Sequence, residues 1–120
     1  MSIRNRLDEL CDEMDIKERK HYRLTLGWRR LQATIDALNL VDGTINEKDR
    51  IYKTRELLYA MELSTVADRE KVERQLDKLA VEYDRLVQEY HEETGEDYRP
   101  ERGEHPAWAS VGQVYFLSKE

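Results

Sequence analysis

The sequence predicts an all-α protein: an antiparallel three- or four-helix bundle with a coiled-coil-like hairpin and an extended C-terminal arm. Three observations lead to this fold class. Both prolines of the chain, Pro100 and Pro106, lie near its end, so no proline interrupts a helix over residues 1–99. Apolar residues recur every three or four positions through that stretch, which is the period of an amphipathic helix. After Gly95 this period is lost.

The first half of the chain is expected to form two helices, over residues 2–14 and 16–41. A break between them is predicted because Asp15 and Glu18 have the spacing of a capping box, in which two side chains bind free backbone N–H groups at a helix start. One continuous helix is the alternative. The apolar positions of the two helices are Ile3, Leu7, Leu10 and Met14, and then Leu24, Trp28, Leu31, Ile35 and Leu38.

Two further helices are expected over residues 47–63 and 66–93. Thr65 and Asp68 favour a helix start, so a tight turn near Ser64 would make these helices an antiparallel hairpin. Gly95 is expected to end the last helix. In the third helix Ile51, Leu58 and Met61 are expected on the apolar side, with Leu57 beside them. The fourth has the alternating spacing typical of coiled coils, at Val72, Leu76, Leu79, Tyr83, Leu86 and Tyr90.

Residues 1–95 are therefore expected to form one helical domain, and residues 96–120 an arm with an apolar end. Residues 107–117 contain no charged side chain, although 38% of the chain is charged. Such a segment either folds back on its own bundle or docks into another subunit or a different protein. The arm residues expected to contact a partner are Trp108, Val111, Tyr115, Phe116 and Leu117.

Charge is unevenly distributed along the chain. The formal net charge of −6 gives no overall attraction to nucleic acid or to an anionic membrane. Arg19, Arg23 and Arg30 share one helical face and form a basic stripe that is either paired with acidic segments, bound to an acidic partner or bound to phosphates. A second set of charged residues is expected to bind a basic protein partner by imitating phosphate spacing: Glu89, Glu92, Glu93, Glu96 and Asp97.

No catalytic residue, metal ligand or cofactor site is predicted. Di-iron helical bundles need two Glu-x-x-His motifs, and only Glu18 with His21 forms one. The acidic pairs that begin at Glu70 and Glu89 lie on one predicted helix, about 28 Å apart, so they cannot share a metal cluster within one chain. The single cysteine, Cys11, has acidic neighbours that raise a thiol pKa, so it is expected to be a small apolar filler.

The composition also bears on location. No apolar run approaches the about 20 residues of a membrane span, and the first residues are too highly charged for a secretory signal. We therefore expect no membrane association, no small-molecule ligand and a cytoplasmic location, which would be the host cytoplasm if the protein is viral.

Together these features favour a non-catalytic protein that binds other proteins, itself included as a homo-oligomer. By analogy with phage and mobile-element proteins of similar size and composition, it is expected to be a small inhibitor, adaptor or assembly factor that acts through its helix faces and its arm. Two alternatives stay open. One is a self-assembling structural component, and the other is a helical nucleic-acid-binding protein that uses the basic stripe.

Overall fold

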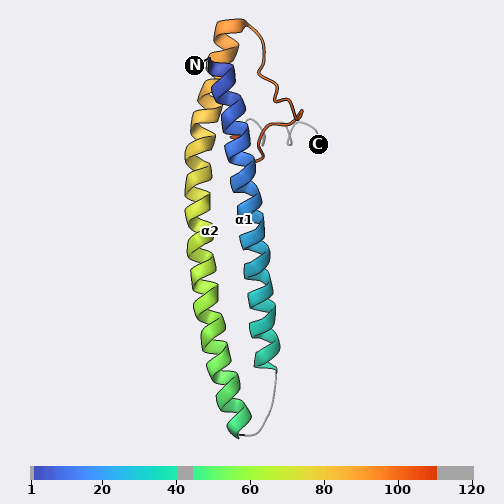
Figure 1. The fold of residues 1–120 in the computed structure, drawn as a ribbon, viewed down its shortest axis with the longest axis vertical. Helices are drawn as coiled ribbons and strands as arrows, with labels where there is room; N and C mark the ends of the chain where they lie inside the picture. The colour runs from blue at the N-terminus through green and yellow to red at the C-terminus, as the bar shows by residue number, and fades with distance from the viewer. Residues whose placement is uncertain (1, 41–44, 111–120) are drawn as a thin grey trace. The chain divides into compact units, whose positions relative to one another are not determined.

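The computed structural model describes residues 2–40 and 45–110, which form two long helices and an irregular segment (Figure 1). The first helix, α1, spans Ile3–Asn39, and the second, α2, spans Ile45–Thr94. The prediction of an all-α protein is confirmed over these residues, which contain no strand. The three or four helices expected within one chain are not found there, because two helices replace them.

The predicted helix break at Asp15 is wrong, since α1 continues through this residue. The Asp15 carboxylate does not cap a helix start; it pairs with Arg19 one turn further on and with Arg102, each at 3.0 Å. Glu18 accepts a hydrogen bond from the backbone N–H of Trp108 at 3.0 Å. The two side chains of the capping pattern therefore bind other partners. No proline or glycine nearby interrupts the helix.

The predicted turn at Ser64 is also wrong, because α2 is helical throughout this region. The Thr65 hydroxyl donates a hydrogen bond to the carbonyl of Met61, one turn earlier, at 2.8 Å. A threonine inside a helix commonly makes this bond, so its presence does not mark a helix start. The antiparallel hairpin expected between residues 47–63 and 66–93 is replaced by packing of α1 against α2.

The end of α2 agrees with the prediction. Gly95 follows the last helical residue, its φ is 73°, and its N–H donates to the carbonyl of His91 at 2.8 Å. A Cβ built at Gly95 would meet no neighbouring atom within 4 Å. Glycine is therefore required here by the left-handed backbone conformation and not by lack of space.

The contacts between residues divide the chain into two compact units. Unit 1 combines the chain up to Lys20 with the chain from Val72 onward. Its irregular segment, residues 97–110, turns back against the two helices (Figure 1). This segment packs against both helices of unit 1 as a third element. The core of unit 1 consists of Leu7, Leu10, Cys11, Met14, Val72, Leu76, Ala80, Tyr83 and Leu86 from the helices, with Tyr98, Pro106 and Ala109 from the segment.

Unit 2 consists of residues 21–71 and has no such third element among its described residues. Its helices are joined near their ends, where Arg55 donates to the Asn39 side chain at 2.6 Å. Ile35 is the one apolar side chain of this unit that is buried among those described. Trp28 and Leu58 are only half-buried, and the Arg69 guanidinium lies 5.4 Å from the centre of the Trp28 ring. Much of the apolar surface of unit 2 is therefore left uncovered.

Candidate functional site

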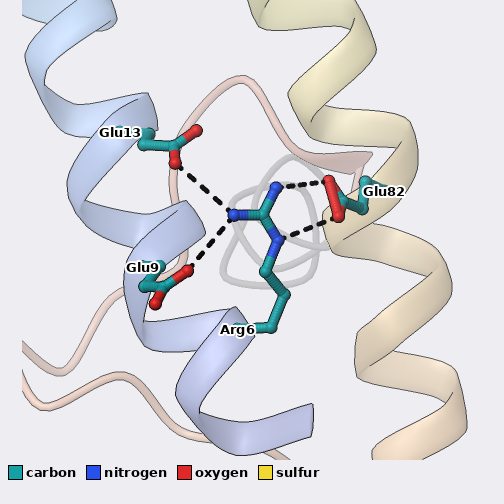
Figure 2. A network of polar contacts seen from close by, with 4 residues as sticks. All are labelled: Arg6, Glu9, Glu13 and Glu82. Atoms are coloured by element: carbon teal, nitrogen blue, oxygen red, sulfur yellow. Dashed lines mark hydrogen bonds and ion pairs between the residues drawn. The ribbon is translucent and has the colours of Figure 1, made fainter. Parts of the chain in front are cut away.

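In unit 1 a charged network links the two helices (Figure 2). The Arg6 guanidinium of α1 donates to both carboxylate oxygens of Glu82 of α2, at 2.9 and 2.8 Å, and it also donates to Glu9 and Glu13. The hydrogen bond from Arg6 lowers the pKa of Glu82, and the bond to Glu82 raises the pKa of Arg6. These side chains are partly exposed, so solvent screens the ion pair and its contribution to stability is small. The network therefore helps to fix the register of α1 against α2 in unit 1.

A partly buried cluster of polar side chains, which we call the tyrosine cluster, joins the irregular segment to both helices. It consists of Asp8, Cys11, Tyr83, Tyr98 and His105. The Tyr83 hydroxyl lies 2.6 Å from Nδ1 of His105, and the Tyr98 hydroxyl donates to Asp8 at 2.5 Å. The Cys11 sulfur lies 3.7 Å and 3.8 Å from the Tyr83 and Tyr98 hydroxyls. The cluster therefore satisfies its polar groups internally while it holds residues 97–110 in place.

Burial sets the protonation states of the tyrosine cluster. It raises the pKa of the Cys11 thiol and of both tyrosine hydroxyls, and it lowers the pKa of His105. A raised thiol pKa means that Cys11 holds its proton at neutral pH, whereas a nucleophilic cysteine needs a thiolate. In neutral His105 an unprotonated Nδ1 can accept a hydrogen bond from the Tyr83 hydroxyl. The cluster thus connects the segment to both helices through hydrogen bonds between uncharged side chains and the Asp8 carboxylate.

The lowered pKa of His105 predicts that unit 1 loses stability as the solution becomes acidic. The unfolded chain binds a proton at this histidine near its ordinary pKa of 6.5, which is higher than in the folded state. Stability is therefore full above that value and falls as pH decreases toward the folded-state pKa. His105 packs against the rings of Tyr83 and Tyr98. The charged groups that affect its pKa are Asp84, Asp97 and Arg102.

This pH dependence can be measured by urea unfolding at pH 7.5 and pH 5.5 in a Trp28→Phe background, where the remaining fluorescence comes from Trp108. In a His105→Gln variant the side chain still accepts a hydrogen bond but no longer titrates. We expect the loss of unfolding free energy at the lower pH to be smaller in this variant than in the unmodified protein. An equal loss in both proteins would assign the pH dependence to other groups.

A cavity of about 410 Å³ opens beside the tyrosine cluster. Its charged lining is mixed, because Arg102 accompanies the carboxylates and is itself bound to Asp15. Among the described residues no group of three His, Cys, Asp or Glu side chains is arranged to hold a metal ion. The cavity is lined by Asp8, Cys11, Asp12, Tyr98, Pro100, Glu101 and Arg102.

The structure places only one of the five predicted arm residues. Trp108 is half-buried on unit 1, where its indole N–H donates to Asp77 at 2.7 Å and its backbone N–H donates to Glu18. The arm was expected either to fold back on its own helices or to dock into another protein. Trp108 folds back on its own helices. The other four residues, Val111, Tyr115, Phe116 and Leu117, lie outside the described part of the chain.

The predicted acidic partner-binding residues lie at the end of α2 and just after it. Glu89 accepts from Arg85 at 3.1 Å, Glu92 accepts from Gln88 at 3.4 Å, and Asp97 pairs with His91 at 3.0 Å. Glu93 and Glu96 are exposed. Three of the five side chains therefore already have partners within the chain.

The predicted basic stripe lies on α1. Arg19 is exposed but paired with Asp15 at 3.0 Å, and it belongs to unit 1. Arg23 and Arg30 are exposed in unit 2. The stripe is thus available to solvent, although its first member has an intramolecular partner.

Sequence reasoning missed two rows of exposed apolar side chains on α2 in unit 2, with Tyr52, Tyr59 and Leu63 in one row and Leu57 and Met61 in the other. Met61 and Leu57 were expected on the buried side of this helix with Ile51 and Leu58, but they are 54% and 68% exposed. The 3.6-residue period places Tyr52 about 100° around the helix from the half-buried Ile51, which was the available signal. We call the exposed side of residues 49–71 the α2 outer face. Its large apolar residues are Tyr52, Leu57, Tyr59, Met61 and Leu63.

No helix in the described part of the chain is long and apolar enough to cross a membrane. In comparisons with known proteins, no family model, no curated protein and no solved structure matches the chain.

Proposed function

We propose that the protein is a non-catalytic protein-binding protein of the adaptor, inhibitor or assembly-factor class, and that the α2 outer face is its docking surface. One observation carries this proposal: five large apolar side chains are exposed within twelve residues of one helix, from Tyr52 to Leu63, in two rows that flank Ala60. Single exposed apolar residues are ordinary on protein surfaces, whereas a gathering of them marks an interaction site.

The contrast between the two units supports the same proposal. Unit 1 covers its helix pair with residues 97–110, and its core side chains Leu7, Leu76 and Tyr83 are fully buried. Unit 2 has two helices of similar composition but no covering segment among its described residues. A helix pair alone buries little apolar surface, so a further element contributed by a partner would stabilise it.

Binding of nucleic acid by the basic stripe has less support. Arg19 is engaged by Asp15, which leaves Arg23 and Arg30 as the exposed members without a described carboxylate contact. Affinity for a phosphate backbone grows with the number of phosphates neutralised, so two arginines on an acidic protein provide little. The apolar outer face is the stronger surface.

Site-specific photo-crosslinking tests this proposal. A photoreactive phenylalanine analogue is introduced at Ala60, in the middle of the α2 outer face, and at exposed Lys78 in unit 1 as a matched control. We expect a discrete protein adduct from position 60 in the native lysate. It should disappear when Leu57→Lys and Leu63→Lys are combined, and the pattern from position 78 should persist. Position 60 adducts no different from those at position 78, or unchanged by the lysines, would contradict the proposal.

A further inference from the structure

We propose that the row of Leu57 and Met61 on the α2 outer face continues onto α1, and that this combined surface binds an amphipathic helix with acidic edges from another protein. This inference rests on the proposed function; it names the side of the helix pair that is used and the chemistry of the partner. We call the surface the leucine side of unit 2. Its half-buried residues are Leu24, Leu31, Leu38, Ile51 and Leu58, and its exposed apolar residues are Leu57 and Met61.

The helical register places these residues on one side of the helix pair. In α1 the three leucines recur every seven residues, and Leu31 lies about 60° back around the helix from Trp28. In α2 Met61 lies about 60° back from Leu58, and Leu57 lies about 100° back. Because the two helices run antiparallel, a backward turn on either one points to the same side of the pair.

A contact in unit 1 shows the same register directly. Arg6 directly precedes the buried Leu7 in α1, and Glu82 directly precedes the buried Tyr83 in α2. The Arg6 and Glu82 side chains bind each other (Figure 2). Residues that lie back from the core positions of the two helices therefore meet on one side of an antiparallel pair.

The opposite side of unit 2 is closed by polar contacts. Arg55 donates to Asn39 at 2.6 Å, and Arg69 donates to His21 at 3.4 Å. The Arg69 guanidinium also lies 5.4 Å from the centre of the Trp28 ring. Asn39 directly follows a residue of the leucine side, so it is turned about 100° away from that side. An apolar element that completes the core of unit 2 is therefore expected on the leucine side.

The charges along the outer edges differ between the two sides. The leucine side has one exposed acidic residue, Asp68, and four exposed basic residues, which are Arg23, Arg30, Arg50 and Lys71. The opposite side has one exposed basic residue, Arg29, and four exposed acidic residues, which are Asp36, Asp49, Glu56 and Glu70. An apolar surface with positive edges is complementary to a partner with negative edges.

The same charges disfavour a second copy of this chain as the occupant. A two-fold pairing of leucine sides would bring two positive edges together, and like charges across an interface oppose binding. A helix fits the surface, because an amphipathic helix can lay its apolar stripe along two packed helices. From Arg50 to Lys71 α2 rises about 32 Å, which a partner helix of about 21 residues would cover.

Two synthetic peptides test the chemistry of the partner. Both have about 21 residues, with leucines at alternating spacings of about three and four, and they differ only in their flanking residues, which are glutamates in one and lysines in the other. Fluorescence anisotropy measures binding of each labelled peptide to the purified full chain. We expect the glutamate peptide to bind about ten-fold more tightly than the lysine peptide, and added salt to reduce the difference. Equal affinities, or a preference for lysine, would overturn the inference.

Substitutions in the protein test which side is used. Arg30→Glu reverses a charge on the leucine side, and Arg29→Glu reverses the neighbouring exposed charge on the opposite side. We expect Arg30→Glu to weaken the glutamate peptide about five-fold, since an exposed attraction becomes a repulsion, and Arg29→Glu to leave it unchanged. Far-UV circular dichroism verifies that each variant is folded. Equal effects of the two substitutions would contradict the assignment of the leucine side.

The apolar rows provide a second matched comparison. Combining Leu57→Gln with Met61→Gln should weaken both peptides, because it removes the exposed apolar part of the leucine side. Combining Tyr59→Gln with Leu63→Gln changes the other row and should leave both affinities unchanged. The reverse result would place the partner on the other row and overturn the inference.

The outcomes also separate this inference from the proposed function. If neither peptide binds and position 60 still crosslinks to a protein, the partner chemistry is wrong and the docking surface stands. If neither peptide binds and position 60 yields no specific adduct, both are wrong. Binding to phosphatidylserine vesicles without peptide binding, or a dimer in sedimentation equilibrium that Met61→Gln disrupts, would assign the leucine side to a membrane or to a second copy and overturn the inference.

Discussion

Replacing Tyr83 with alanine is expected to lower the unfolding free energy of unit 1 by about 3–5 kcal/mol. Tyr83 is the largest side chain in the fully buried set, its ring contacts the Tyr98 ring edge-on at 6.2 Å, and its hydroxyl contacts His105 and Cys11. Alanine would leave a cavity beneath residues 97–110 and remove their central polar contact. Urea unfolding measures the change.

The two tryptophans allow this measurement to be assigned to one unit. Trp28 lies in unit 2 and Trp108 lies in unit 1, so in a Trp28→Phe background the fluorescence reports unit 1 alone. Tyr83→Phe is the matched control, because it keeps the ring and removes only the hydroxyl. We expect it to cost about 1–3 kcal/mol, since His105 and Cys11 lose a buried partner. An alanine variant no less stable than the phenylalanine variant would contradict the packing argument.

Leu76→Ala is expected to be the second most damaging of these changes, at about 2–5 kcal/mol. The Leu76 side chain is 0% exposed, whereas Val81 on the same helix is 71% exposed. Val81→Ala therefore serves as the control, and we expect it to change stability by no more than about 0.5 kcal/mol. Thermal and urea unfolding of the two variants in the Trp28→Phe background measure the difference. Equal effects at both positions would mean that Leu76 is not a core residue.

The helical period of the sequence predicts much of what the structure shows. Leu76, Tyr83 and Leu86 were placed on one apolar side of a helix, and all three are buried. Cys11 was expected to fill apolar space and is buried. Gly95 was expected to end a helix and does so. Periodicity and a terminal glycine are local signals, so one sequence is enough to interpret them.

The helix breaks were mispredicted because a capping pattern has more than one use. Asp15 and Glu18 have the residue types of a capping box, but their partners include Arg102 and Trp108, about 90 positions away in the chain. No pattern over a few residues reveals such a partner. Thr65 similarly bonds to the carbonyl one turn before it.

The candidate surfaces were predictable to different degrees. The α2 outer face follows from the helical period once the helix is known to be continuous through Ser64, because Tyr52, Tyr59 and Leu63 then form one row beside the half-buried positions. The tyrosine cluster could not be predicted. Tyr98 and His105 lie in a polar segment without regular structure, and only the fold brings them to Asp8 and Tyr83.

The construction of unit 1 from distant segments has a consequence for its synthesis. Tyr98 bonds to Asp8 across 90 positions, whereas unit 2 consists of consecutive residues 21–71. On the ribosome unit 2 emerges whole and can pair its helices early, but unit 1 must wait until residues 97–110 have been made. During that interval Leu7, Leu10 and Met14 lack their final cover. The nascent chain is therefore most open to chaperones and to aggregation through its first helical turns.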